Sequence, residues 1–449
     1  MGSRLSHVPG EKGLPVIGHA LEIVRNPYLW EERMRQSYGD VFRYNALFED
    51  RINLTGVEAV EKVLIDQERI FSAERGYRPL FADLAPPGLK ALPLMDFDEH
   101  RWYRRAIANA FSGRAMRGYF DQLQTVIPAT VRSWGTKDAP LVYPLVKELS
   151  QEMAATAFLG LDGQYDRAAV DEALSNYMNA QISLIRRAWP GTAMRKGLNG
   201  LYYIADILKQ EIPMRRGKDL KDVFSLLCNA RDDDGNYLSD DEIASFGLIS
   251  WTAAHDSLSS TVTALVYELC QHPEIMARVR DEITGVSDRA EDLVYDDLAK
   301  LPLTEGCIKE TLRLYTPLYH TPRVAIKDTE FQGTHIPEGT TVTVGVASMH
   351  RDPRYWDDPE EFRPERFIED AAGQTQARHP RLAWAPFGGG AHSCIGLAFG
   401  MMQIKLIISA LLTNFDVERN GRGDAQFVYL PLIRPKDKLP VRLTPRVAH

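Results

Sequence analysis

Hydrophobic residues recur at helical spacing along most of this 449-residue chain. The pattern predicts helices over 101–111, 118–134, 141–158, 167–187, 199–212, 239–271, 273–284, 303–314 and 395–413. Strand-like alternation is confined to 42–60 and to 335–347, where a Pro-Glu-Gly turn precedes a β-branched run. The sequence therefore predicts a mainly α-helical protein with a small β region.

The longest predicted helix, 239–271, opens with a capping-box pattern. Ser239 and Glu242 stand at the spacing at which both side chains satisfy free backbone amides of a first helical turn. The chain has no repeat period and no long low-complexity linker. We therefore expect one large domain over 1–449.

Composition narrows the class of protein. The 44% apolar and 25% charged fractions are typical of a soluble globular protein, which excludes disordered and fibrous chains. The formal net charge of −8 gives no general attraction to nucleic acid or to an anionic membrane. The polar, proline-broken start and the lack of a long uninterrupted apolar run predict neither a signal peptide nor a membrane span.

The cysteines and the acidic residues offer few metal sites. Cys228, Cys270, Cys307 and Cys394 lie far apart without a C-x-x-C pair, which favours a reducing, cytoplasmic location.

The acidic run 232–234 is similar to the start of a calcium loop. Gly235 is misplaced for the required turn, however, and Ile243 stands where a bidentate Glu is needed. We expect a solvated loop there.

The segment 387–396, FGGGAHSCIG, carries the clearest chemical signal. Its three glycines permit positive φ angles and a close approach of the backbone to a flat ligand. Cys394 falls at the start of the helix predicted over 395–413, where the helix dipole favours the thiolate that ligates iron. A lone cysteine at such a place is more often an ordinary buried thiol. The assignment of Cys394 as an iron ligand therefore depends on the sequence of the whole segment.

The whole decapeptide resembles the haem-binding loop of cytochromes P450, matching it at Phe387, Gly390, Cys394 and Gly396. The resemblance implies the cytochrome P450 fold, haem b (iron protoporphyrin IX) as cofactor, contact of Phe387 with it, and Cys394 as the axial iron ligand. His392 stands where many members have Arg, and implies a hydrogen bond to a haem propionate. A surface-loop histidine is the alternative.

Other motifs agree with this resemblance. Glu310 and Arg313 share a helix face, and with Arg366 they resemble the family's Glu-Arg-Arg network. An isolated pair of this kind would be a weak surface ion pair. The resemblance implies instead a buried network that serves folding of the haem-side core.

The long helix carries an acid followed by an alcohol. Small residues at Ala253 and Ala254 resemble those where the family's central helix crosses the distal haem face, and Asp256-Ser257 matches its catalytic pair. The acid is implied to relay protons, and the hydroxyl to hydrogen-bond the reacting oxygen. Ser257 replaces the usual Thr and lacks its stiffening β-branch. The alternative is that these small and polar residues only mark a point where the helix packs closely across a neighbouring element.

Three further basic residues match propionate ligands of the family. His100 and Arg104 lie one helical turn apart, and Arg323 follows in Thr-Pro-Arg. Arginine suits carboxylates through its bidentate fork. Considered alone, each of these basic residues would more often be a solvent-exposed surface residue. The resemblance runs from Pro9 to about Pro435 and is weakest across 160–230.

The implied reaction is insertion of one atom of O₂ into a lipophilic small molecule (terpenoid, steroid, fatty-acyl or aromatic). No dinucleotide or flavin motif is evident, so electrons are expected from an external ferredoxin or flavoprotein, with the chain as a monomer. Arg101 and Arg105 are candidates for binding this electron donor. The alternative is that they only keep one face of a helix soluble. The expected pocket walls are Tyr77–Leu94, Ile249, Ala253, Ala254, Leu318, Tyr319 and Tyr429–Leu432.

Two other functions stay open at this stage. A haem-thiolate isomerase, dehydratase or peroxygenase needs no electron supply, and Asp256 with a hydroxyl at 257 argues against it. A haem-based sensor would need only Cys394, yet no output domain is visible.

Overall fold

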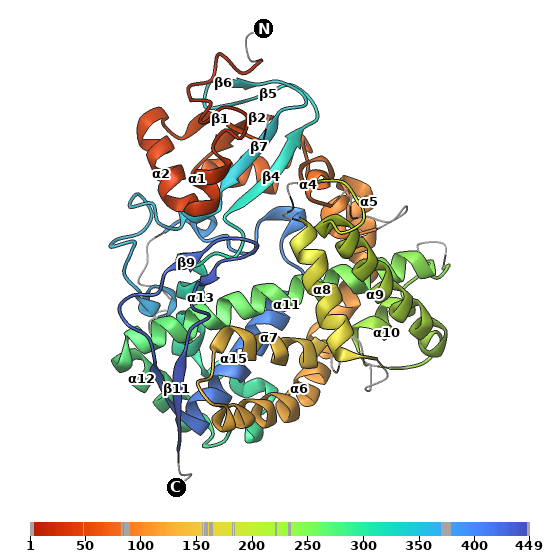
Figure 1. The fold of residues 1–449 in the computed structure, drawn as a ribbon, viewed down its shortest axis with the longest axis vertical. Helices are drawn as coiled ribbons and strands as arrows, with labels where there is room; N and C mark the ends of the chain where they lie inside the picture. The colour runs from red at the N-terminus through yellow and green to blue at the C-terminus, as the bar shows by residue number, and fades with distance from the viewer. Residues whose placement is uncertain are drawn as a thin grey trace.

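The computed structural model describes residues 4–47, 49–81, 84, 90–154, 156, 160, 165–181, 183, 185–220, 222–231, 235–369 and 379–446. Helices dominate this part of the chain, and the strands within residues 41–54 (β1, β2) and 320–345 (β4 to β7) gather toward the N-terminus, whereas β11 (Val441–Pro445) lies beside the C-terminus (Figure 1). The predicted fold class, mainly α with a small β region, is confirmed.

A helix lies within every region in which the apolar spacing predicts one. The helices are α1 (Ala20–Arg25), α2 (Pro27–Tyr38), α3 (Val57–Ala59), α4 (Ala73–Phe81), α5 (Phe97–Ala108), α6 (Gly113–Ser133), α7 (Val142–Met153), α8 (Arg167–Gln181), α9 (Ala193–Arg215), α10 (Val223–Cys228), α11 (Asp240–Gln271), α12 (Pro273–Val286), α13 (Pro302–Leu314), α14 (Val346–Met349) and α15 (Leu397–Asn414). The apolar pattern missed six helices, α1, α2, α3, α4, α10 and α14. The inward face of α2 includes the buried carboxylate of Glu31.

The main sheet joins distant parts of the chain. Its strand order is β1 (Val41–Ala46), β2 (Glu49–Leu54), β7 (Thr341–Gly345), β4 (His320–Ala325) and β3 (Phe71–Ser72). The β2–β7 pair is parallel, with Arg51 opposite Thr341, and the other pairs are antiparallel.

Three two-stranded sheets complete the β structure of the described residues. They are β5 (Thr329–Phe331) with β6 (Thr334–Ile336), β9 (Phe427–Val428) with β10 (Arg434–Pro435), and β8 (Phe415–Arg419) with β11 (Val441–Pro445). The strand predicted over 335–347 corresponds to β6 and β7, and the alternation over 42–60 to β1 and β2.

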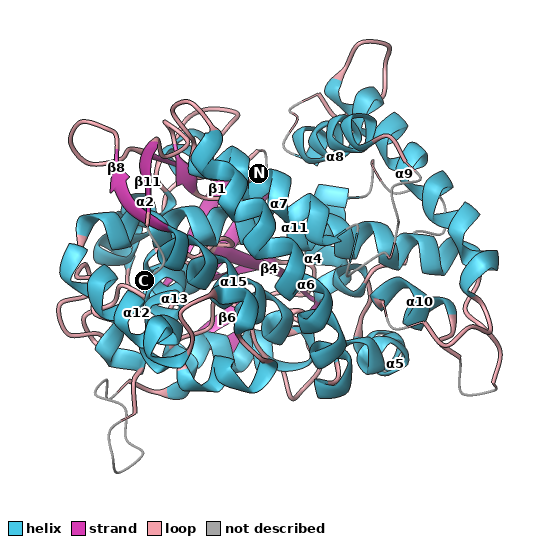
Figure 2. Ribbon diagram, turned by 90° about the horizontal axis from the view of Figure 1, so that it is seen from below, coloured by secondary structure: helices cyan, strands magenta, loops and turns pink. Residues whose placement is uncertain are grey.

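Helix α11 crosses the molecule between the sheet and the helices α6, α7 and α15 (Figure 1). Its predicted capping box is present, because the Glu242 amide donates to Ser239 Oγ and the Ser239 amide donates to the Glu242 carboxylate. Figure 2 places α8, α9 and α10 at one end of the molecule, away from the strands. The central helix thus extends to the helical end, where it packs against α9 and α10.

Two large apolar clusters form most of the core of the described residues. The larger one includes side chains of α6, α7, α11, α13 and α15, and the smaller one lies under the sheet. The smaller cluster also contains Val60 and Leu64 of the π-helical segment η1 (Val60–Ile65), together with Ala385 just before the 387–396 loop. Helix α15 is long and apolar enough to cross a membrane, but most of it is buried within the protein, as in a core helix.

Candidate functional site

The 387–396 loop is closed by its own backbone. The Cys394 amide donates to the Phe387 carbonyl at 2.8 Å, so the ends of the loop meet. Gly388 and Gly390 have φ angles of 72° and 62°, which favour glycine. A Cβ at Gly390 would stand 2.3 Å from the Leu64 carbonyl oxygen. The glycine at 390 therefore allows the loop to pack against η1.

Cys394 is a free thiol that remains accessible to solvent. Helix α15 begins at Leu397 with Gly396 as its N-cap, two residues later than predicted. Burial raises the pKa of Cys394, while the Gly396 amide, which donates to its sulfur, and the charge of Arg104 lower it. The expected preference for thiolate is thus outweighed by burial in the protein alone. A metal ion at the sulfur would reverse this, because coordination deprotonates a thiol.

Four basic side chains, His100, Arg104, Arg323 and His392, are brought together beside Cys394; we call them the basic cluster. His100 and Arg104 come from α5, Arg323 from β4 and His392 from the loop. The rings of His100 and His392 lie 3.8 Å apart between centroids. Arg104 extends to the loop, where its guanidinium donates to Ser393 Oγ at 3.4 Å.

Arg323 approaches from the sheet. Its side chain is buried, donates to the Pro322 carbonyl at 2.8 Å and lies over the Tyr77 ring. Its charge acts on both histidines of the basic cluster. The structure therefore joins positions that the sequence placed in three separate motifs.

Among the described residues, the basic cluster has little negative charge beside it: Asp96 raises the pKa of His100 as the last of four causes, and Asp66 lies near the charge of Arg323. Burial, then Arg104 and Arg323, lowers the pKa of His100 to about 4. Burial, then Arg323, His100 and Arg104, lowers the pKa of His392 to about 2. Both ring nitrogens of His100 are buried without a hydrogen-bond partner. Among the described residues, no carboxylate is ion-paired with the basic cluster.

Buried ring nitrogens without a hydrogen-bond partner, beside arginines that are not ion-paired with a described carboxylate, suit an anionic group. The propionates of haem b supply carboxylates of that kind, and Cys394 supplies a thiolate ligand of the type used for haem iron. The residues present therefore fit haem b.

Helix α11 has one accessible stripe in its otherwise buried middle. Ala253 is exposed, and Ile249, Ala254 and Ser257 are half-buried, at positions that share one helix face. Ser257 Oγ donates to the Ala253 carbonyl at 2.7 Å. The hydroxyl and the small residues thus lie on the same accessible face of α11.

Asp256 points away from this stripe. Its carboxylate is almost fully buried and faces α7, where Lys147 Nζ lies 3.6 Å from Oδ1. Burial raises the pKa of Asp256, and the Lys147 charge opposes the rise. Sequence reasoning missed Lys147, because a lysine on an amphipathic helix usually indicates only a solvated face.

The Glu310, Arg313 and Arg366 side chains form the expected buried network. Arg313 donates to both carboxylate oxygens of Glu310 at 2.8 Å, and Arg366 Nε donates to Oε1 at 3.2 Å. Arg313 also donates to the carbonyls of His350, Pro359 and Glu361. Every charge is paired inside the protein, which favours a structural role.

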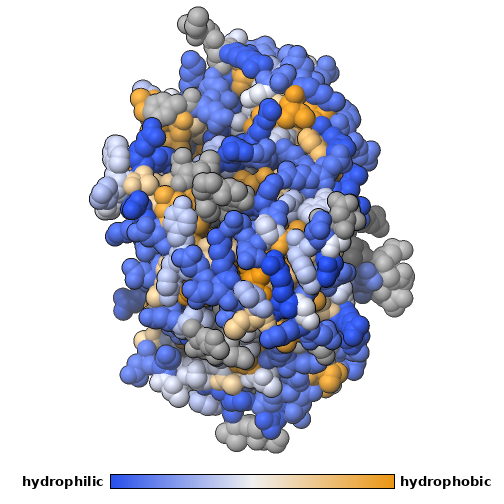
Figure 3. All heavy atoms as spheres, turned by 90° about the vertical axis from the view of Figure 1, so that its right-hand side faces the viewer, coloured by the Kyte–Doolittle hydropathy of each residue, from blue (hydrophilic) through white to orange (hydrophobic). Residues whose placement is uncertain are grey.

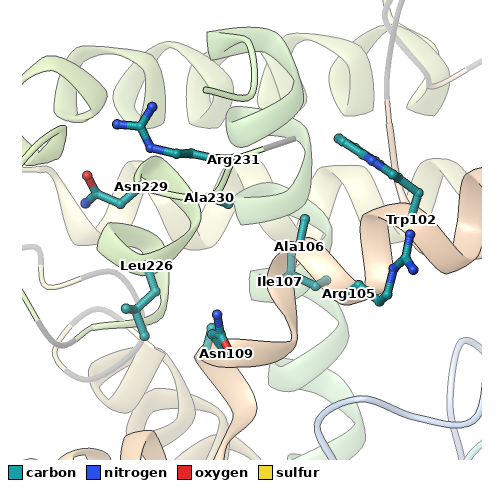
Figure 4. A pocket seen from close by; sticks show the side chains of 10 residues that line it. Trp102, Arg105, Ala106, Ile107, Asn109, Leu226, Asn229, Ala230 and Arg231 are labelled. Carbon is teal, nitrogen blue, oxygen red and sulfur yellow. The ribbon is translucent and has the colours of Figure 1, made fainter. Parts of the chain in front are cut away.

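A cleft of about 550 Å³ lies on the other side of α5. It is lined by Trp102, Arg105, Ala106, Ile107, Asn109, Ala110, Leu226, Asn229, Ala230 and Arg231 (Figure 4). No member of the basic cluster lines it, so it is separate from the site around Cys394. The acidic run 232–234 lies outside the described residues, and no group of acidic, His or Cys residues elsewhere in the described ranges could hold a metal ion.

Comparison with known proteins identifies the family. Residues 8–439 match the cytochrome P450 family, and the chain belongs to it. The chain is 32% identical, over 99% of its length and 90% of the relative's, to a Mycobacterium tuberculosis protein named cytochrome P450 136. It is 28% identical to the pentalenene oxygenase of Streptomyces avermitilis, with 96% of each chain covered.

A solved structure has the same fold. The retinoic acid-bound cyanobacterial CYP120A1 superposes with a TM-score of 0.87 at 27% identity, covering 98% of this chain and 99% of that one. The chain is accordingly a haem-thiolate monooxygenase with haem b as its cofactor, and uses O₂, a small-molecule substrate and a redox partner.

Proposed function

We propose that this protein inserts one oxygen atom from O₂ into an isoprenoid substrate, with Cys394 as the axial haem ligand. The observation that carries the site assignment is the accessible Cys394 thiol beside four basic side chains, none of which is ion-paired with a described carboxylate, and of which His100 has two buried ring nitrogens without a hydrogen-bond partner. When bound, haem b supplies reductive activation of O₂. His100, Arg104, Arg323 and His392 would hold its propionates.

The remaining site residues have roles that follow from their positions. Phe387 accepts the Cys394 amide hydrogen bond and so fixes the direction of the thiol. Ala253 leaves room for the cofactor on the accessible stripe of α11. Ser257 presents a hydroxyl there, and Asp256, buried behind it, holds and releases protons.

The substrate class rests on relatives and on the predicted walls. Pentalenene oxygenase is named for a terpene, and the matching solved structure holds retinoic acid, also an isoprenoid. Tyr319 and the 429–432 turn are half-buried, and Leu318 is exposed. Part of the expected wall, 82–83 and 85–89, lies outside the described residues. A mostly apolar wall suits an isoprenoid chain or ring.

We further propose that the chain acts as one domain over 1–449, as a cytoplasmic monomer that receives electrons from a ferredoxin or flavoprotein. Helix α5 presents Arg101 and Arg105 to solvent while Arg104 turns toward the loop. Figure 3 shows that the face carrying α8 to α10 is mostly hydrophilic with separate apolar spots. The exposed arginines of α5 suit electrostatic steering of a transient electron donor.

The test of the ligand assignment is the spectrum of the reduced, haem-loaded chain with CO. We expect the strongly red-shifted Soret band of a thiolate complex, abolished by Cys394→Ala and kept by Cys270→Ala, a matched loss of a half-buried thiol. Retention of the band in Cys394→Ala would refute Cys394 as ligand.

The test of the reaction and substrate uses a panel of an isoprenoid acid, a sesquiterpene, a steroid and a fatty acid. We expect isoprenoids to shift the ferric Soret band and to be hydroxylated only with NAD(P)H, an electron donor and O₂. Turnover without electrons would indicate an isomerase or dehydratase instead, and a response to the steroid or fatty acid alone would refute the isoprenoid class.

A further inference from the structure

Trp384 brings an oxidisable ring to the 387–396 loop. Its indole contacts the Phe387 ring, with the ring centroids 5.9 Å apart and an angle of 68° between the planes. The Phe387 carbonyl in turn accepts a hydrogen bond from the Cys394 amide at 2.8 Å. One ring contact and one hydrogen bond therefore join Trp384 to the residue proposed as the haem ligand.

Two hydrogen bonds hold Trp384 in place. Its indole Nε1–H donates to the Lys309 carbonyl of α13 at 3.2 Å. The next residue, Ala385, donates its amide to the buried His350 ring at 2.9 Å. The Trp384 side chain is half-buried, so part of it remains open to solvent. Trp384 is thus fixed relative to the loop and still within reach of a small dissolved reductant.

A second indole, Trp356, belongs to the same group of aromatic rings. The Phe367 ring contacts both indoles, at 5.6 Å from Trp384 and 5.8 Å from Trp356 between centroids. Trp356 is fully buried, and its Nε1 has no hydrogen-bond partner. The guanidinium carbon of Arg313 lies 5.2 Å from the centre of its ring. The two indoles therefore differ in exposure, in the partner of Nε1 and in the charge beside the ring.

These differences decide which indole loses an electron more easily. An indole that has lost an electron is positively charged, and its N–H is a stronger hydrogen-bond donor. The Lys309 carbonyl stabilises such a charged donor at Trp384. At Trp356, burial without an acceptor opposes the charge, and Arg313 repels it. Removal of an electron is therefore easier at Trp384.

We propose that Trp384 is a protective one-electron donor to the haem site, a function separate from insertion of oxygen into a substrate. The inference rests on the proposed ligation of haem iron by Cys394. Trp384 acts when oxidising equivalents reach the cofactor and no substrate is there to consume them. The indole then gives up an electron in place of the Cys394 sulfur, which further oxidation converts irreversibly to an acid.

Electrons and atoms balance with peroxide as the oxidant and a low-molecular-weight thiol as the reductant. Hydrogen peroxide takes two electrons and two protons at the haem site, its O–O bond breaks, and two molecules of water leave. Trp384 supplies these electrons one at a time. Each time it becomes an indole radical cation that keeps its Nε1 proton, because a carbonyl is too weak a base to accept it. Two thiols reduce the indole in turn, and they form one disulfide and release two protons.

Electron paramagnetic resonance tests this without product formation. The haem-loaded protein is mixed with hydrogen peroxide in the absence of substrate and rapidly frozen. We expect the signal of a tryptophan radical, which narrows when the tryptophans carry ring deuterium. Trp384→Phe keeps an aromatic ring beside Phe387 but is not oxidised in this way, so it should lose most of the signal and its haem should bleach severalfold faster. Retention of the full signal would refute Trp384 as the donor.

A matched control is Trp356→Phe, which removes the other indole of the same aromatic group. It should keep the signal and the parental rate of bleaching, and loss of the signal would assign the radical to Trp356 instead. Trp102→Phe is a second control, because Trp102 lines the cleft on the other side of α5 (Figure 4). Loss of the signal in that variant would likewise overturn the proposal.

Trp384→Tyr keeps the test decisive if the phenylalanine variant folds poorly. A tyrosine at this half-exposed place can be oxidised as well, so the tryptophan signal should give way to a tyrosyl signal that responds to ring-deuterated tyrosine. A tryptophan signal that persists would refute the assignment. Added low-molecular-weight thiol should shorten the lifetime of the parental signal, and an unchanged lifetime would refute reduction by thiols.

The CO spectrum of each preparation tests the proposed function separately. A thiolate band without a tryptophan signal in the parent would refute Trp384 as an electron donor and leave Cys394 as the ligand. Absence of the thiolate band would instead refute the ligation on which both proposals depend.

Discussion

The imidazole rings of His100 and His392 lie 3.8 Å apart, with an angle of 33° between their planes. Their close contact suits neutral rings, and burial with the nearby arginine charges lowers the pKa of both. One ring comes from α5 and the other from the loop before α15. This contact fixes two donors at the edge of the site where a propionate is expected.

The first prediction concerns cofactor retention. Arg104→Met and His100→Phe should each weaken haem binding roughly ten- to hundredfold, since a hydrogen bond to a charged group contributes about 1.5–3 kcal/mol. Transfer of haem to excess apomyoglobin measures the loss. Arg101→Met, an exposed change on the same helix, should release haem at the parental rate. Parental retention by Arg104→Met would remove it from the proposed propionate ligands.

The second prediction concerns the acid and the alcohol of α11. Ser257→Ala should divert electrons to peroxide and lower product per NAD(P)H severalfold, because the hydroxyl on the accessible stripe is lost. Asp256→Asn should slow product formation by about 100-fold. Ser259→Ala removes a buried hydroxyl bonded to the His255 carbonyl and should remain coupled. Full coupling in Ser257→Ala would assign its role to water or another residue.

The third prediction concerns the buried network around Glu310. Glu310→Ala leaves Arg313 and Arg366 without their counterion and should lower the free energy of unfolding by about 3–5 kcal/mol. Urea unfolding measures this change. Arg446→Ala, at a surface ion pair with Asp416, should cost less than about 1 kcal/mol. Equal losses in the two variants would contradict a structural role for the network.

The fourth prediction concerns the pH dependence of stability through His350. The Ala385 amide donates to its Nε2 at 2.9 Å, so Nδ1 carries the proton and donates to Thr316 Oγ1 at 2.8 Å. Burial, followed by the charges of Arg313 and Arg351, lowers the pKa of His350 to about 3. The ordinary pKa of an unfolded histidine is about 6.5. Between these values the unfolded state binds more protons.

Stability contributed by neutral His350 is therefore complete above about pH 6.5 and falls by about 1.4 kcal/mol per pH unit as the pH decreases toward 3. The nearly isosteric His350→Gln should remove this part of the slope. Urea unfolding of parent and variant at several pH values gives the difference. If the free energies of unfolding of the parent and the variant change equally with pH between about 3 and 6.5, His350 has the same protonation in the folded and unfolded states.

The fifth prediction concerns electron delivery. Arg101 and Arg105 are exposed on α5, where Arg101 lies 3.7 Å from Asp98, and Arg117 of α6 is paired with Asp296 at 2.8 Å. Arg101→Glu with Arg105→Glu should slow first-electron transfer from an acidic ferredoxin at low salt, and added salt should slow the parent. Arg25→Glu with Arg422→Glu, charge changes of the same size elsewhere, should have little effect. A rate insensitive to both variant and salt would remove α5 from the docking surface.

The apolar spacing predicted the long helices that pack one face on a large core, and it missed the short helices α1, α3, α4, α10 and α14 as well as α2. Helix α2 was not predicted because a polar residue, Glu31, lies on its buried face. Glu31 accepts a hydrogen bond from Asn53 and contacts His320. Buried polar networks between distant segments leave no periodic signal. The proximity of Lys147 to Asp256 was not predicted for the same reason, because the two residues meet only when α7 packs against α11.

The site residues were predictable where a short motif carries the chemistry, as in 387–396 and at Asp256-Ser257. Their spatial relations were not. That Arg323 on β4 acts on both His100 and His392 depends on the sheet, whose strand order no local pattern indicates. Burial also changed the expected ionisation of Cys394, because desolvation opposes the effect of the Gly396 amide.

The parallel pairing of β2 with β7 has a consequence for biosynthesis. Arg51 cannot meet Thr341 until about 290 further residues have left the ribosome, which takes roughly 15–60 s at typical elongation rates. Throughout that interval the nascent β1–β2 hairpin has an unpaired edge and apolar residues that will later be covered by β7. We therefore expect the N-terminal part of the chain to depend on chaperones during translation, and haem insertion to follow release of the completed polypeptide.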